Sequence, residues 1–280
     1  MIDFSKSIYE NRQIKGTPFI AAHRGINGAN IPPNTITSYQ MALAMGADVV
    51  EIDVSISKDG EYFVFHPGME NRYIGGGVKL PNLTASEIDA LRLLNTDGVK
   101  TSYKIPRLGE VLALLKGKVY INVDKFWTDI PGISRAIREA GVADQVLVKT
   151  YTDEESLSAV KKYASDFMFI PMVRAKDEVT DALISDGVNV IGAEILFSSE
   201  EDEVISAEYI RKMHDKNLLI WVNSIVYNER DVISAYHTDD SAFNISPDHG
   251  WGWLIDRGAD FIQTDWLLPL ASYIKEKYNQ

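Results

Sequence analysis

Short apolar runs alternate with amphipathic stretches along most of this chain. The runs are rich in β-branched residues and nearly continuous, which is typical of parallel strands that are covered on their outer face. We predict eight strands, at 19–25, 49–55, 119–126, 145–151, 167–173, 190–197, 218–224 and 261–267. Segments between them, such as TITSYQMALAMGA, place apolar residues three and four positions apart and are expected to be helices.

Eight strand–helix repeats in 280 residues predict a (β/α)8 TIM barrel that forms one domain over 1–280. The main alternative is an open, doubly wound sheet. A glycine-rich phosphate turn does not follow the first strand, which favours the barrel. After the second strand, KDG predicts a tight turn into a hairpin strand, EYFVFH, and then a small insertion at about 67–118. A second insertion, 225–250, follows the seventh strand.

The second strand, VVEIDVSIS, carries aliphatic side chains on one face and Glu51 and Asp53 on the other. In a barrel the acidic face would point toward the axis. Asp124 ends the third predicted strand, so three carboxylates from two adjacent strands are expected to meet. Carboxylate oxygens are the ligands that Mg²⁺ and Ca²⁺ prefer, and this much buried negative charge is costly without a cation. We therefore predict one divalent cation at Glu51, Asp53 and Asp124.

Two histidines are expected beside these carboxylates. His23 and Arg24 end the first strand, and His66 ends the hairpin. Two imidazoles and a guanidinium next to a divalent cation suit phosphoryl transfer, because one imidazole can accept a proton while the other donates one. Alone, HRG is commonly a strand end and ExD a solvated face. Their combination at one rim favours a catalytic site.

The other histidines and the tryptophan pair have ordinary interpretations. His214 is expected on the surface of a helix, and His237 and His249 in a solvated loop. Trp251 and Trp253 are expected to pack a helix, and YIGGGVK to be a flexible loop, since it lacks the pattern of a nucleotide-binding loop.

Composition limits the possible partners and compartments. The net charge of −12 argues against nucleic acid and against anionic membranes as partners. The chain has no cysteine, which excludes disulfides and thiolate chemistry. Its start does not read as a signal peptide and no apolar run is long enough to span a bilayer, so we expect a cytoplasmic protein without stable membrane insertion. A small molecule is the expected partner, and the oligomeric state is left open.

Several ordered motifs resemble the glycerophosphodiester phosphodiesterase family. AAHRG, PPNTITSYQMALAMGADVVEIDVSISKDG and FVFH are similar to the family's HRG, PENT, GAD-x-x-E-x-D and strand ending in histidine. NLTASEIDAL, IPRLGEVLALL, LLIWVNS and GADFIQTDWL continue the likeness, which covers about 19 to 270. The resemblance implies a TIM barrel that hydrolyses a glycerophosphodiester to glycerol 3-phosphate and an alcohol with a divalent cation.

Transferred to matching positions, the resemblance implies an acid–base pair and a metal site. His23 and His66 would be the pair, and the predicted metal ligands are those named above. The expected substrate contacts are Arg24, Lys149, Glu194 and Trp221.

Three positions depart from the family pattern. Pro33 replaces the glutamate of PENT, and Pro67 replaces the aspartate that usually follows the second histidine. The family commonly has Glu-x-Lys on the third strand, whereas Asp124 here is followed at once by Lys125, which strand alternation would point to the opposite face. An inward cation could then come from Lys149, and the alternative is that Lys149 pairs with Glu194.

Two rival functions stay open. A phospholipase D-like or phosphoinositide-type lyase on the same barrel would release a cyclic phosphate. A barrel that binds a phosphorylated ligand without turnover is the other, although binding alone does not need an acid–base pair. The sequence shows no membrane-docking surface, so a soluble, deacylated substrate is expected.

Overall fold

Eight parallel strands close into a barrel in the computed structural model, which describes residues 2–28, 30–228 and 230–278. β1 pairs with β2 on one side and with β9 on the other, and these pairings close the sheet. The predicted TIM barrel is confirmed, and an open doubly wound sheet is excluded. The barrel strands are β1 (Phe19–Ala22), β2 (Val49–Ile56), β4 (Tyr120–Asp124), β5 (Val146–Thr150), β6 (Met168–Arg174), β7 (Gly192–Leu196), β8 (Leu219–Asn223) and β9 (Phe261–Thr264).

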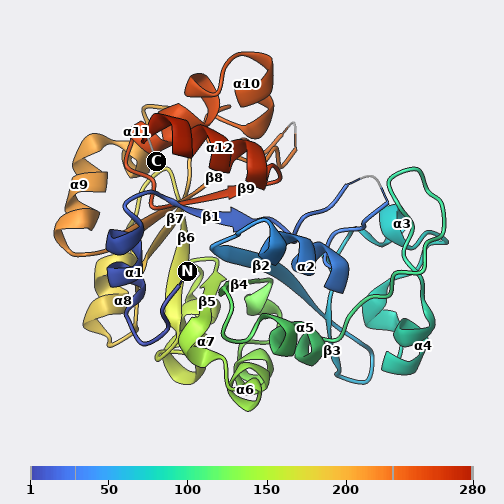
Figure 1. Cartoon of the computed structure of the whole chain (residues 1–280). Coiled ribbons are helices and arrows are strands. Elements are labelled where there is room, and N and C mark those ends of the chain that lie inside the picture. The colour runs from blue at the N-terminus through green and yellow to red at the C-terminus, as the bar shows by residue number, and fades with distance from the viewer. Residues whose placement is uncertain (1, 29, 229, 279–280) are drawn as a thin grey trace.

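Helices follow the strands and cover the outside of the barrel (Figure 1). Within the described residues, no helix is both long and apolar enough to cross a bilayer. The helices are α1 (Ile8–Lys15), α2 (Ile36–Ala44), α3 (Glu70–Tyr73), α4 (Ala85–Ala90), α5 (Leu108–Leu115), α6 (Ile130–Ala140), α7 (Glu154–Tyr163), α8 (Thr180–Ser185), α9 (Ala207–Asp215), α10 (Asp239–Asn244), α11 (Trp253–Asp256) and α12 (Leu267–Lys277).

The barrel interior is apolar near the amino ends of its strands. Trp221 stacks on Phe261 there with ring centroids 5.0 Å apart, and Ile8 of α1 packs against the same cluster. The side chain of Val49 on β2 belongs to this layer, while Glu51 and Asp53 follow it on the same face of the strand. The apolar layer therefore forms a floor, and the acidic residues lie above it, toward the carboxyl ends.

The insertion after β2 has a small core of its own. β3 (Tyr62–Val64) pairs antiparallel with the end of β2, which confirms the predicted hairpin. Phe63, Tyr73 and Ile88 pack in a cluster apart from the barrel core, and α3 and α4 project to one side of the barrel (Figure 1). The range expected for the insertion includes α5, whose buried leucines pack against the barrel core.

The close approach of β7 and β8 depends on a glycine. A Cβ atom on Gly192 would lie 2.0 Å from the carbonyl oxygen of Leu219. We expect Gly192→Ala to lower the free energy of unfolding by about 1–3 kcal/mol, because the two strands must separate. The matched control is Gly109→Ala in α5, where a Cβ would meet nothing within 4 Å. It should stabilise the helix by up to about 1 kcal/mol. Equal urea midpoints for the two variants would contradict this account.

Candidate active site

The turn after β1 places His23 and Arg24 at the mouth of the barrel. The backbone of His23 still pairs with Thr264 of β9, and Arg24 and Gly25 then take left-handed conformations with φ of 57° and 72°. A Cβ on Gly25 would lie 2.7 Å from backbone atoms of Ser38 in α2. Only glycine therefore fits the third position of HRG, and this packing fixes the direction of the two preceding side chains.

Asp265 holds the ring of His23. The Oδ1 atom of Asp265 lies 2.8 Å from Nδ1 of His23, and the backbone N–H of Asp265 donates to the buried carboxylate of Asp239. Sequence reasoning assigned no role to Asp265 or Asp239. An acidic residue directly after the last barrel strand was the available signal for Asp265, since that position lies at the same rim as His23.

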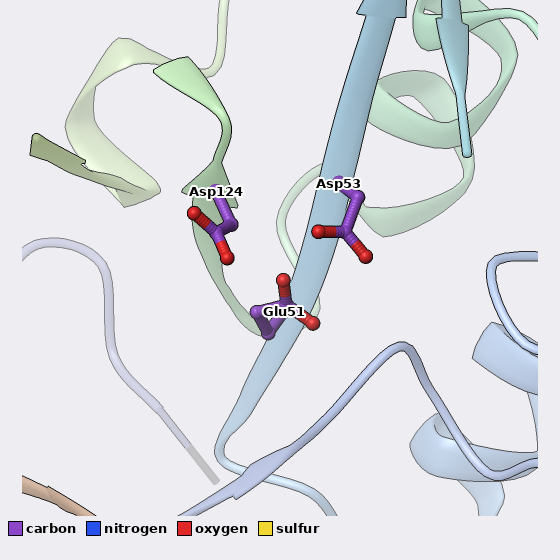
Figure 2. Close-up of side chains that lie close together, drawn as sticks. All are labelled: Glu51, Asp53 and Asp124. Atoms are coloured by element: carbon purple, nitrogen blue, oxygen red, sulfur yellow. The ribbon is translucent and has the colours of Figure 1, made fainter. Parts of the chain in front are cut away.

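The side chains of Glu51, Asp53 and Asp124 lie close together on β2 and β4, as Figure 2 shows. One oxygen of each carboxylate lies within 4.8 Å of the others. Glu51 and Asp53 are fully buried, and Asp124 is partly buried at the end of β4. This is the trio predicted from the sequence. Oxygens around one Ca²⁺ at about 2.4 Å can lie up to about 4.8 Å apart, so the trio can hold a divalent cation.

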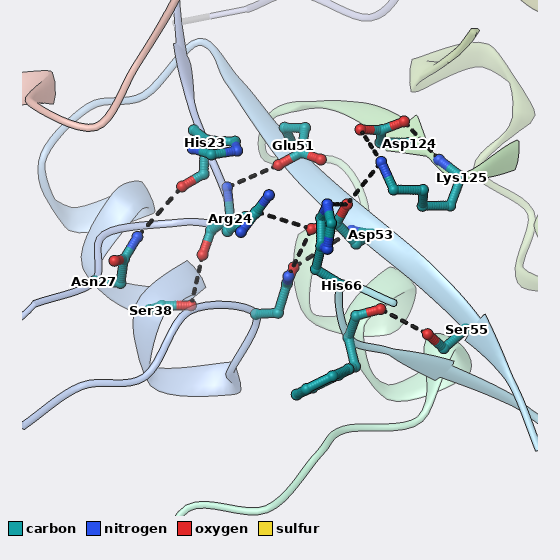
Figure 3. Close-up of polar contacts among 12 residues, drawn as sticks. His23, Arg24, Asn27, Ser38, Glu51, Asp53, Ser55, His66, Asp124 and Lys125 are labelled. Atoms are coloured by element: carbon teal, nitrogen blue, oxygen red, sulfur yellow. Dashed lines mark hydrogen bonds and ion pairs between the residues drawn. The ribbon is translucent and has the colours of Figure 1, made fainter. Parts of the chain in front are cut away.

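Among the described residues, one oxygen of each carboxylate of the buried pair has no hydrogen-bond donor. The backbone N–H of Arg24 donates to Oε2 of Glu51, and the Nε atom of Arg24 lies 3.0 Å from Oδ2 of Asp53 (Figure 3). Within the described part of the chain, Oε1 of Glu51 and Oδ1 of Asp53 accept no hydrogen bond. Buried carboxylate oxygens without a donor are costly, and a cation bound between them would remove that cost.

The pKa values of the three acids differ with their surroundings. Burial, with the charge of Asp53 added, raises the pKa of Glu51 to about 7. Burial also opposes ionisation of Asp53, but Arg24 and His66 outweigh it and lower the pKa of that carboxyl. At Asp124, Lys149 and Lys125 likewise overcome burial and hold the pKa well below its usual range. Glu51 is therefore the carboxyl that most needs an additional positive charge.

His66 reaches the same space from the hairpin. Its Nε2 atom lies 3.9 Å from Oδ1 of Asp53, and neither ring nitrogen has a hydrogen-bond partner among the described residues. Burial lowers the pKa of His66. Pro67 follows it, so the aspartate expected at that position from the family pattern is not available to hold the ring.

The prediction that Lys125 points away from the site is wrong. β4 ends at Asp124, and Lys125 takes a left-handed conformation with φ of 59°, so strand alternation no longer applies. Its Nζ atom lies 3.1 Å from Oδ2 of Asp124 and 3.8 Å from Oδ1 of Asp53. The site thus has a lysine from the third barrel strand as well as one from the fourth.

Lys149 satisfies both of the alternatives considered for it. Its Nζ atom lies 3.0 Å from Oε2 of Glu194 and 3.9 Å from Oδ2 of Asp124. Burial disfavours its charge, but Asp124 and Glu194 outweigh burial and raise its pKa. Asn223 donates to the other oxygen of Glu194, which holds this carboxylate in place.

Five of the predicted catalytic or substrate-binding side chains line one cavity at the mouth of the barrel: His23, Arg24, His66, Lys149 and Glu194. The predicted metal ligand Asp124 lines the same cavity. Trp221 is buried below them and donates to Asn223. It is not among the residues that line the cavity, so a direct contact with substrate stays a prediction that the geometry does not favour.

Asn34 is a further residue whose role the sequence did not reveal. It has φ of 58°, donates to Oδ2 of Asp53 at 2.8 Å, and accepts from the hydroxyl of Tyr39. It follows Pro33 in the PPNT segment. An asparagine directly after two prolines suggested a turn at this position, because asparagine tolerates the left-handed conformation better than most residues.

The expectation of a solvated loop is wrong for His237. The side chain is buried and its ring stacks on Trp253 with centroids 3.8 Å apart. One ring nitrogen faces the carbonyl oxygen of His249 at 2.7 Å and the other faces Glu200 at 3.0 Å. The 225–250 segment thus has a packed interior. His214 is exposed, as predicted, and pairs with Asp260.

Comparisons with known proteins agree on one family. The chain matches the model of the glycerophosphoryl diester phosphodiesterase family over residues 23–265. A glycerophosphodiester phosphodiesterase of Caldanaerobacter subterraneus subsp. tengcongensis is 33% identical over 153 residues, which are 52% of this chain and 62% of that protein. The chain thus spans less than two thirds of that relative's length.

Two solved structures have a similar fold. A glycerophosphoryl diester phosphodiesterase from Parabacteroides distasonis superposes with a TM-score of 0.75 at 23% identity, covering 93% of this chain and 87% of the other. An Oleispira antarctica phosphodiesterase in complex with the product sn-glycerol-3-phosphate gives a TM-score of 0.65 at 16% identity, covering 94% and 98%. At these identities the likeness concerns the fold.

Binding of a divalent cation should depend on pH in a defined direction. The cation needs Glu51 ionised, and the raised pKa of this residue means that a proton competes for the site below about pH 7. We expect Ca²⁺ affinity, measured by calorimetry, to strengthen as pH rises from 6 to 8, with release of a proton at the lower pH. Glu51→Gln should weaken binding at every pH. An affinity that is constant over this range would contradict the predicted competition.

Proposed function

We propose that this protein, which belongs to the glycerophosphoryl diester phosphodiesterase family, hydrolyses a glycerophosphodiester to glycerol 3-phosphate and an alcohol with one divalent cation. The observation that carries the proposal is the meeting of His23, Arg24 and His66 with a buried acidic trio at one cavity. These residues come from separate chain segments. Their convergence at the carboxyl ends of the strands is the arrangement that phosphoryl transfer requires.

Glu51, Asp53 and Asp124 would hold the cation. Within the described residues, one oxygen of Glu51 and one of Asp53 lack a hydrogen-bond donor, and this and the 4.8 Å spacing of the trio support the assignment. When bound, a divalent cation supplies a Lewis acid that stabilises negative charge on a phosphoryl group. We infer Mg²⁺ or Ca²⁺, since both prefer oxygen ligands.

His23 is suited to accept a proton. With Asp265 on Nδ1, the N–H of this nitrogen is directed at a carboxylate, and Nε2 keeps its lone pair for an attacking hydroxyl. Among the described residues His66 has no hydrogen-bond partner, and it lies across Arg24 from His23. In its protonated form it would donate a proton to the departing oxygen. The attacking group is water or a hydroxyl of the substrate's own glycerol.

Arg24 and Lys125 are the cations that we assign to the phosphate. Arg24 is held by Asp53, and the ammonium of Lys125 lies between Asp53 and Asp124. Lys149, paired with Glu194, would balance the charge of Asp124 from below and be a positioning residue. The expected cytoplasmic location and small-molecule partner are part of the same proposal.

Removing either imidazole should abolish most of the activity. We expect His23→Ala and His66→Ala each to lower turnover of glycerophosphocholine by about 10² or more, because each removes one proton transfer. The control is His214→Gln, which changes a histidine of α9 that does not line the cavity. Near-normal turnover in either of the first two variants would show that the acid–base assignment is wrong.

Metal removal and product analysis separate the rival functions. We expect excess EDTA to stop turnover, added Mg²⁺ or Ca²⁺ to restore it, and phosphorus NMR to show glycerol 3-phosphate as the final product. Full activity in EDTA would remove the cation from the mechanism. Accumulation of a cyclic phosphate would favour the lyase. Binding of the diester without any product would favour a barrel that binds a phosphorylated ligand without turnover.

A further inference from the structure

One wall of the catalytic cavity is apolar. Met172, Leu196, Ile225 and Ile233 form a separate buried cluster against which Trp127 packs, and all five residues line the cavity that holds the two histidines. Acid–base chemistry on a small polar diester does not require such a wall. The wall borders the same cavity as the two histidines, so a phosphodiester bound between these histidines would place a substituent beside it.

The same wall continues into a neighbouring hollow on the 225–250 segment. This hollow shares Ile225, Tyr227, Asp231 and Ile233 with the catalytic cavity. Its other lining residues include Val226, Val232, Tyr236 and Ile245, with polar residues such as Thr238 and Asn244 beside them. Ile245 is 67% exposed and Tyr236 is 68% exposed. Large apolar side chains left in water beside a catalytic cavity are typical of a binding surface.

The exposed apolar residues gather on this face. Phe243 of α10 and Trp266 after β9 are half exposed and touch edge to face, with ring centroids 4.9 Å apart. Val226 and Tyr227 have similar exposure and line the hollow, and Tyr227 also lines the catalytic cavity. We call Val226, Tyr227, Tyr236, Phe243, Ile245 and Trp266 the apolar rim.

Charge around the apolar rim limits what can cover it. Asp231 at the cavity wall is paired with Arg174 at 3.0 Å, so its charge is balanced, whereas Asp240 of α10 lines the hollow and is exposed. The chain as a whole carries a net charge of −12. These charges disfavour an anionic lipid surface. An uncharged chain attached to the substrate fits, because the rim adjoins the place where the phosphate binds.

We propose that the preferred substrate is a glycerophosphodiester that carries an apolar chain, and that this chain lies along the apolar rim. The inference rests on the proposed function, and it replaces the deacylated substrate expected from the sequence. The chain can be an acyl group on the glycerol or an alkyl group on the alcohol, and both offer the same chemistry to the rim. Burying methylene groups should therefore raise kcat/KM steeply with chain length.

The test compares matched chain lengths below their aggregation thresholds. Glycerophospho-n-alkanols and 1-acyl-glycerophosphocholines, each with two to eight chain carbons, are assayed with the divalent cation present. We expect kcat/KM to rise at least about tenfold across one series, from the free energy of methylene burial. The series in which kcat/KM rises shows whether the apolar chain is attached to the alcohol or to the glycerol of the preferred substrate.

Paired variants assign the effect to the rim. Ile245→Ser should keep the turnover of two-carbon substrates and lose most of the gain with length. Ile14→Ser is the control, since Ile14 is 66% exposed on α1, the helix whose Ile8 packs against the floor at the amino ends of the strands. A flat dependence on chain length, or an unchanged gain in Ile245→Ser, would overturn the inference. An Ile245-dependent dimer, or binding to phosphatidylcholine vesicles without chain selectivity, would also overturn it.

Direct binding separates this inference from the proposed function. Calorimetry with n-alkyl phosphates of two and eight carbons measures chain binding without turnover, and we expect about tenfold tighter binding of the longer one. If affinity rises with length while no diester is hydrolysed, the proposed function fails and chain binding stands. If diesters are hydrolysed but neither affinity nor kcat/KM depends on chain length, the proposed function stands and the inference of chain binding fails.

Discussion

Uncompensated negative charge at the mouth of the barrel is the constraint on which the site depends. Ion pairs with Arg24, Lys125 and Lys149 balance part of it, but acidic side chains still outnumber these cations. Burial, with the charge of Asp53 added, raises the pKa of Glu51, which agrees with an excess of negative charge at this residue. A divalent cation would supply the missing positive charge. It would also act as the Lewis acid that activates a phosphodiester for attack. The acidic carboxylates of this site are Glu51, Asp53, Asp124, Glu194 and Asp265.

The barrel makes this concentration of charge possible. Its floor of packed rings, with Trp221 and Phe261, supplies apolar burial that stabilises the fold, and the acidic trio of the site lies above it. Each charged side chain comes from a barrel strand or from the turn directly after one. A rigid sheet thus holds groups that repel one another at fixed spacing, which loops alone could not do.

The sequence predicted the barrel and most of the site because both depend on periodic patterns. Alternation on β2 placed Glu51 and Asp53 on the inner face, and the ends of the predicted strands located His23 and Asp124. The misses lie where periodicity stops. Lys125 turns inward through a left-handed conformation, and His237 is buried by contacts with Glu200 and Trp253 from other segments. Asn34 and Asp265 act through long-range hydrogen bonds, whose partners the sequence does not identify even though the positions of the two residues were suggestive.

The most direct measurement of the central claim is a crystal structure of the protein soaked with Ca²⁺ and glycerol 3-phosphate, with the cation located by its anomalous scattering. We predict one peak at about 2.4 Å from oxygens of Glu51, Asp53 and Asp124, with the phosphate between the rings of His23 and His66. A cation bound elsewhere, or a phosphate that touches neither ring while the acidic trio stays without a cation, would contradict the account.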